Sequence, residues 1–210
     1  MDIDERINRI MNKMKNLSSI QPEFRCGEFP PKWDNPLDEQ MIERYEKANG
    51  ITLPEDYRRF ITTVAGSGTQ PFYGLYSPVG ESTQYAPKAD IKEKFPYTVR
   101  TPLNVAELSD KEYDAIFETE ELNIDAGYVL LCHEGCGMYS ILIVNTDDED
   151  TYGTVWFYDL ANDAGIYPLI HQGTNRAMRF LDWLEYYADR TLELGNTGYF
   201  SYGELAGRIE

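Results

Sequence analysis

Three short apolar runs in the second half of the chain constrain its fold more than any other feature of the sequence. Runs 128–132 and 138–145 flank a glycine-bearing segment at 134–137, and run 153–159 follows the polar stretch 147–150. Apolar runs of this length, bounded by glycine and polar residues, are typical of strands, and a short connection containing glycine is typical of a hairpin. The sequence therefore predicts three strands of one sheet here.

Helical periodicity marks both ends of the chain. Near the N-terminus apolar residues recur every three or four positions, which predicts an amphipathic helix with this stripe: Ile3, Ile7, Ile10, Met14 and Leu17. We expect this helix to lie on the body of the domain, and the alternative is a helix that detaches to bind a partner. A closing helix is expected over 176–192, with Trp183 buried against the sheet.

Two short helices are expected after the first one. Asn35 is a suitable N-cap with Pro36 in the first turn, and Gly50 marks the end of that helix. The next helix begins at Pro54 and stops near Gly66. The expected buried side of the first of these helices consists of Leu37, Met41, Tyr45 and Ala48.

The middle of the chain has weaker patterns. We expect a strand at 72–76, and then a helix over 107–125 that turns Tyr113, Ile116 and Phe117 inward and carboxylates outward. Together these elements predict an α+β fold, in which a mixed, largely antiparallel sheet is packed by N-terminal helices and a C-terminal helix.

The expected domain organisation has three parts. An amphipathic helix and a Pro-rich connector occupy residues 1–36, one domain occupies 37–192, and a tail occupies 193–210.

Charge restricts the partners of the chain. It contains 36 acidic and 19 basic residues, for a net charge of −17. This field opposes direct binding to nucleic-acid phosphates or to an anionic membrane surface, and it favours a basic protein partner. We predict that the partner contacts two acidic surfaces. One is the polar stretch 147–150, which joins the second and third predicted strands and is called the hairpin tip below; it carries Asp147, Asp148, Glu149 and Asp150. The other is the outer face of the 107–125 helix, which carries Glu112, Glu118, Glu120 and Glu121. The alternative is that both are solvated surfaces.

A cytoplasmic location is expected. The longest apolar stretches have the length of strands, and the first residues include Asp2, Asp4 and Glu5, unlike a signal peptide. The cysteine count of three is odd and low, which suits a reducing compartment.

The residues with metal-binding or catalytic potential form no complete site in the sequence. Cys132, His133, Glu134 and Cys136 suggest zinc, but a structural zinc site normally has four ligands, and further candidates such as Cys26 and His171 are remote. Cys132 and His133 are adjacent strand residues and should point to opposite faces, which disfavours a nucleophile pair. The run 147–150 lacks the ligand spacing of a calcium loop, and no phosphate-binding loop occurs. We expect no catalytic residue, no metal and no cofactor.

Six short strings in order over residues 37–192 resemble the SUKH superfamily, which includes bacterial immunity proteins and yeast regulators of cell-wall assembly. They are LPEDYRRF (53–60), PFYGLY (71–76), KFPY (94–97), CHEGCG (132–137) followed by ILIV (141–144), GTVW (153–156) and FLDWLE (180–185). The sequence has Ala65 where the family often has Asn, and both ends of the chain lie outside the resemblance.

The resemblance implies an immunity protein that binds a cognate polymorphic toxin, such as a basic nuclease, and masks it stoichiometrically. Tyrosine and tryptophan are available as interface anchors, since the chain has 16 and 3 of them, respectively. One alternative is a regulatory or scaffold module of the cell-wall regulator type. Another is a hydrolase that uses Cys132 and His133. A monomer is the default expectation.

Overall fold

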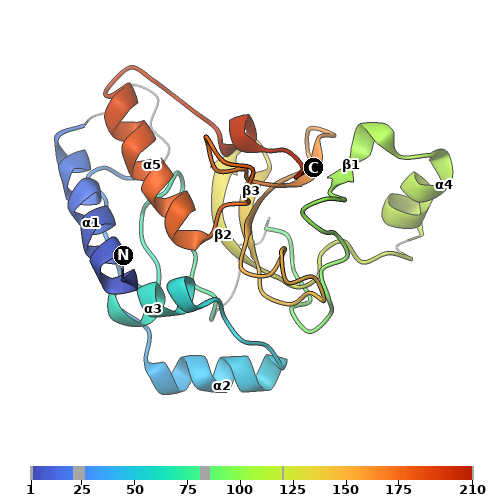
Figure 1. Ribbon diagram of the computed structural model, residues 1–210, viewed down its shortest axis with the longest axis horizontal. Helices are drawn as coiled ribbons and strands as arrows, with labels where there is room; N and C mark the ends of the chain where they lie inside the picture. The colour runs from blue at the N-terminus through green and yellow to red at the C-terminus, as the bar shows by residue number, and fades with distance from the viewer. Residues whose placement is uncertain (1, 21–26, 81–85, 120, 210) are drawn as a thin grey trace.

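The computed structural model describes residues 2–20, 27–80, 86–119 and 121–209, and it places one antiparallel sheet between a helical layer and a layer of loops (Figure 1). The strands are β1 (Leu103–Asn104), β2 (Tyr128–Gly135), β3 (Met138–Ile143), β4 (Val155–Asp159) and β5 (Gly165–Pro168). Their order is β1-β5-β4-β3-β2, and every pairing between them is antiparallel. The predicted α+β fold is confirmed.

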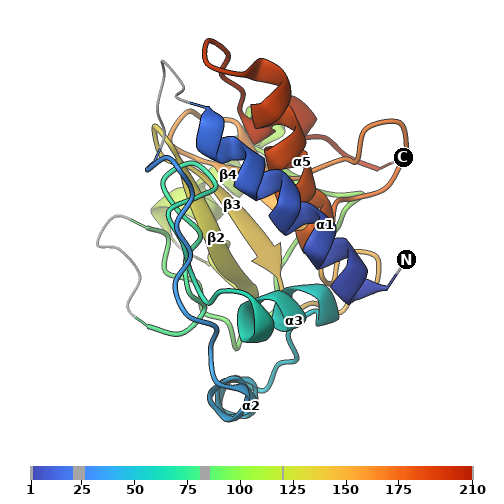
Figure 2. The same cartoon turned by 90° about the vertical axis from the view of Figure 1, so that its left-hand side faces the viewer.

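Helices α1 (Ile3–Asn16), α2 (Glu39–Asn49), α3 (Glu55–Thr63) and α5 (Phe180–Leu194) contribute to the core on one face of this sheet. The short helix α4 (Asp110–Tyr113) lies with the loops at the other end of the molecule. The shorter turns are η1 (Leu17–Ser19), η2 (Val105–Glu107), η3 (Asp114–Glu118) and η4 (Tyr202–Leu205). Figure 2 shows α1 and α5 side by side across the sheet. Of the described residues, no helix has the length and apolar character needed to cross a membrane.

Alternation along the central strands separates two apolar cores. Leu142 and Val155 belong to the core shared with α1, α3 and α5, whereas Ile141 and Trp156 belong to a second core under the loops and α4. Successive strand residues point to opposite faces, so β4, in which all five residues are buried, is covered on both sides. The loop layer supplies that cover on the second face.

The N-terminal stripe is buried as expected. Ile7, Ile10, Met14 and Leu17 are all less than 5 % exposed, and α1 packs along α5. The helix thus lies on the body of the protein.

The expected start of the second helix is wrong, and its expected buried face is right only in part. Asp38 is the N-cap and accepts a hydrogen bond from the Met41 N–H at 3.1 Å, while the Asn35 carbonyl accepts one from Gly66. Residues 35–37 therefore run beside the end of α3 before α2 begins. Ile42 is fully buried, and Leu37 and Tyr45 pack half-buried against the core as expected, whereas Met41 is 42 % exposed and Ala48 is exposed.

Two expectations in the middle of the chain are also wrong. Residues 72–74 form a turn, because Phe72 and Gly74 have positive φ and reverse the chain, and within 72–76 only Leu75 forms β-bridges, to Gly68 and to Cys132 of β2. The expected helix 107–125 is reduced to η2, α4 and η3, and Tyr113 is 43 % exposed where it was expected to point inward. Of the three residues expected to point inward, only Ile116 is buried in the core, and Phe117 is half-buried.

The closing helix, α5, packs Trp183 into the core. It begins at Phe180, four residues after the expected start at 176, and it buries Trp183 completely, as predicted. The Trp183 indole N–H donates to the Ser140 hydroxyl at 3.1 Å, and its ring stacks on Tyr202 of η4. Trp183 thereby joins α5, β3 and the C-terminal segment.

Candidate functional site

The predicted hairpin tip is exposed and acidic but is partly neutralised. Asp147 forms an ion pair with Lys94, and Asp150 lies 3.6 Å from Arg100. Asp148 has a structural role, because it accepts a hydrogen bond from the Thr151 hydroxyl, which in turn accepts the Val99 N–H. Glu149 is exposed.

The carboxylates predicted on the outer face of the 107–125 helix lie in different environments. Glu112 forms a capping box with Ser109, accepting its backbone N–H at 2.9 Å, and the hydroxyl of Ser109 holds the Glu112 pKa below its usual value. Glu118 and Glu121 are exposed. Glu120 lies outside the described residues.

One stretch of chain connects the two acidic segments. Lys94 and Arg100 contact the hairpin tip, and residues 101–104 line a groove together with Glu112 of α4. The tip and the 107–125 segment therefore border the same stretch of chain, the tip through Lys94 and Arg100 and the segment through residues 101–104.

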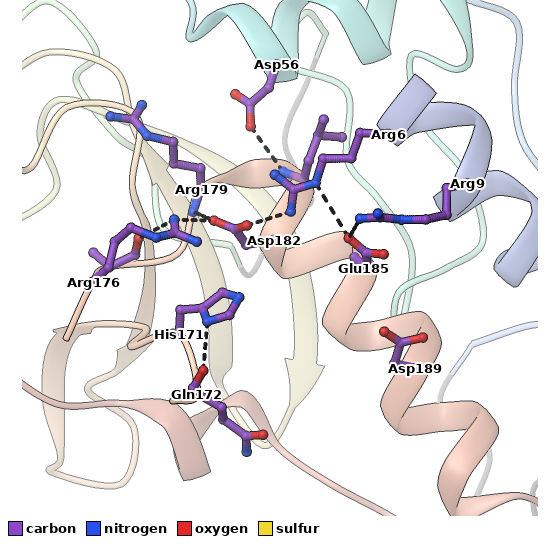
Figure 3. Close-up of polar contacts among 12 residues, drawn as sticks. Arg6, Arg9, Asp56, His171, Gln172, Arg176, Arg179, Asp182, Glu185 and Asp189 are labelled. Carbon is purple, nitrogen blue, oxygen red and sulfur yellow. Dashed lines mark hydrogen bonds and ion pairs between the residues drawn. The ribbon is translucent and has the colours of Figure 1, made fainter. Parts of the chain in front are cut away.

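A second polar region lies between α1 and α5, and its centre is Asp182 (Figure 3). The Asp182 carboxylate accepts from Arg6 at 2.5 Å, from Arg176 at 2.6 Å and from the Arg179 backbone N–H at 2.9 Å. Burial opposes ionisation of this carboxylate, but these donors outweigh it and hold the Asp182 pKa at about 2.

Two further carboxylates extend the Asp182 cluster along α5. Glu185 pairs with Arg9 and Lys13, and Asp189 pairs with Lys13 at 2.7 Å. A groove of about 550 Å³ runs beside these side chains and includes His171. Because Asp182, Glu185 and Asp189 all have cationic partners, the cluster acts mainly as a clamp that fixes α1 on α5.

The Cys132 region does not have the properties of a nucleophilic site. Burial raises the pKa of the Cys132 thiol well above its usual value, so the reactive thiolate is disfavoured. His133 stacks instead between Tyr73 and Tyr139, away from the core that contains Cys132, and desolvation lowers its pKa. The two side chains point to different sides of the sheet, as expected.

Glu134 is a buried carboxylate that sequence reasoning considered only as a zinc candidate. It accepts hydrogen bonds from Ser140, Ser201 and the Tyr202 N–H at 2.8, 3.2 and 3.1 Å. Burial outweighs these bonds and raises the Glu134 pKa to about 7. Within the described ranges it forms no ion pair with lysine or arginine, and no group of three or more His, Cys, Asp or Glu side chains is placed to hold a metal ion. Cys26 lies outside those ranges.

Sequence reasoning missed the Asp182 cluster, although Asp182 falls in the closing string FLDWLE. The only local signal is an acidic residue on the otherwise apolar side of a helix, together with the Arg and Lys residues beside the N-terminal stripe.

Comparison with known proteins gives one result. The profile of the SMI1 / KNR4 family (SUKH-1) matches residues 36–185. That span includes α2, α3, the whole sheet and the first turns of α5, and it begins after α1. No curated protein and no solved structure matches the chain.

Proposed function

Because the chain belongs to the SMI1 / KNR4 family (SUKH-1), which supports a protein-binding function of the immunity or regulatory type, we propose that it is an immunity protein that neutralises a basic toxin. It binds the toxin domain in a stoichiometric complex and blocks access to the toxin's active site. The toxin substrate we favour is nucleic acid, because enzymes that bind phosphates carry basic surfaces.

The observation that carries this proposal is the net charge of the protein, together with the position of its exposed carboxylates. A net charge of −17 is far from neutral for 210 residues, and exposed carboxylates of the hairpin tip and of α4 both lie beside residues 94–104. Complementary fields accelerate encounter between proteins and disfavour wrong partners. An acidic inhibitor of a basic enzyme gains both effects.

Binding without turnover is the mechanism we propose. The Cys132 thiol is buried and His133 points to another side of the sheet, so this region supports no nucleophilic chemistry. The Asp182 and Glu134 carboxylates are engaged in contacts that hold the fold together. The protein then acts in the cytoplasm by occupying its target.

Co-expression with the product of the neighbouring gene tests the proposal. Cells that produce this gene product as a toxin should survive when the protein is supplied, and the two proteins should co-purify. A Cys132→Ala, His133→Ala double variant should protect equally well. A neighbouring gene product that is harmless, yet forms a complex, would favour a regulatory module instead, and loss of protection in the folded double variant would favour a hydrolase.

A further inference from the structure

A groove lies between β1 and the α4–η3 segment. It has a volume of about 360 Å³, and we call it the β1–α4 groove. Its apolar wall is formed by Leu103 of the edge strand β1, by Leu108, by Ile116 of η3 and by Leu122. In Figure 1, β1 and α4 lie together at one end of the molecule, away from α1 and α5.

Several features show that this wall is incompletely covered. Leu122 is 39 % exposed, and Tyr113, on the helix beside the groove, is 43 % exposed. Tyr97 also lines the groove, and its hydroxyl is buried without a hydrogen-bond partner among the described residues. A buried hydroxyl without a partner costs free energy. The groove wall at Ile116 belongs to a π-helical turn, a distortion often found at functional sites.

The charged residues that line the groove have one sign. Glu107 and Glu112 line it, and no lysine or arginine is among its described lining residues. Glu118 and Glu121 are exposed on the adjoining segment. An apolar centre with an acidic rim complements an apolar side chain between basic residues.

We propose that the β1–α4 groove is the docking site for a loop or strand of a basic protein partner, which inserts one apolar side chain flanked by lysine or arginine. The volume is near the lower end of small-ligand pockets, roughly 300 to 1,000 Å³, and suits one or two side chains. The apolar side chain packs on Leu108 and Leu122, and the basic neighbours face Glu107 and Glu112. This inference rests on the proposed function and names the surface through which it acts.

Model peptides test the groove without knowledge of the partner. The probe is acetyl-Lys-Lys-Leu-Lys-Lys-amide, titrated into the ¹⁵N-labelled full chain and followed by amide chemical shifts. We expect saturable shifts concentrated in residues 101–122. The peptide with glycine in place of leucine should bind about tenfold more weakly, because burial of one leucine contributes about that factor. The peptide with glutamate in place of lysine should not bind.

Matched variants give the control. Leu122→Glu should weaken binding of the leucine peptide about tenfold, whereas Met41→Glu changes an equally exposed apolar residue on α2 and should have no effect. Glu107→Lys should also weaken binding, whereas Glu43→Lys on α2 should not. All four positions are half-exposed or exposed, so the variants should fold, and the spectra report this directly.

Three outcomes would overturn the inference. The first is equal binding of the leucine and glycine peptides, and the second is a set of shifts that maps outside the groove. The third is a self-associated protein that Leu122→Glu converts to monomers, since this would mean that a second copy of the chain covers the groove. If the peptide results are negative while the protein still protects cells from the neighbouring gene product, the groove assignment fails and the proposed function stands.

Discussion

Glu134 makes the stability of the protein depend on pH in a direction opposite to that of most carboxylates. The side chain is 1 % exposed and its carboxylate faces Ser140, Ser201 and the Tyr202 N–H. Other titratable groups around it are the Cys132 thiol, the Tyr202 hydroxyl and the Asp159 carboxylate, whose negative charge further opposes ionisation. The folded protein therefore binds this proton more tightly than the unfolded chain does.

The expected magnitude follows from the two pKa values. Glu134 has a pKa of about 7 in the folded protein and 4.5 as its ordinary value. Because each factor of ten in proton affinity is worth about 1.4 kcal/mol, ionisation of Glu134 should cost about 3 kcal/mol of stability. This contribution is fully present below about pH 4.5 and is lost as the pH rises through 7.

The measurement is urea unfolding of wild type and Glu134→Gln from pH 4.5 to 8. Gln alters the local hydrogen bonds, which adds an offset that does not depend on pH. The difference in unfolding free energy, variant minus wild type, should nevertheless rise by about 3 kcal/mol across this range. Glu43→Gln, an exposed substitution on α2, should show no such rise. A constant difference for Glu134→Gln would refute the reasoning and mean that the carboxylate is solvated.

Three further predictions concern the core, the clamp and the hairpin tip. Trp183→Ala should lower the unfolding free energy by about 3 to 5 kcal/mol, because Trp183 is fully buried, and an unchanged urea midpoint would contradict this. Asp182→Ala should cost on the order of 3 kcal/mol and increase hydrogen exchange in α1, whereas Asp189→Ala should change little; equal protection of α1 in both variants would exclude the clamp. Asp147, Glu149 and Asp150 are replaced by Lys, and Asp148 is kept because it accepts a hydrogen bond from Thr151. This variant should associate with the partner more slowly, with a smaller change in dissociation and a weaker salt dependence of the association rate, as measured by stopped-flow kinetics. An unaltered association rate and salt slope would show that the tip is only a solvated loop.

The elements that could be predicted from the sequence are those whose buried residues repeat locally. The α1 stripe and the burial of Trp183 follow from helical periods, and the strands β2, β3 and β4 follow from continuous apolar runs, each within a single segment. The strands β1 and β5 were not predicted, because two and four residues are too few to show alternation.

Other errors arise where tertiary contacts outweigh local preference. Pro36 is a good first-turn residue, but the Leu37 N–H donates to the Ile61 carbonyl at 2.8 Å, and the helix starts only at Glu39. This delay also places Ile42, rather than Met41, in the core.

The polar contacts could not be predicted because their partners are distant in sequence. Arg6 and Asp182 are 176 residues apart, and the donors that surround Glu134 include Ser201 and Tyr202 of the C-terminal segment. The β1–α4 groove likewise combines residues from several loops, which no spacing rule connects.

The most direct test of the account is the stoichiometry of inhibition. Purified protein is titrated into a fixed amount of the toxin domain encoded beside it, at a toxin concentration well above the dissociation constant, and the remaining toxin activity is measured. An immunity protein that acts by occupying its target should abolish activity linearly, with an end point at one protein per toxin and a stable complex of the same ratio. Full toxin activity in excess protein, or inactivation by much less than one equivalent, would contradict stoichiometric masking.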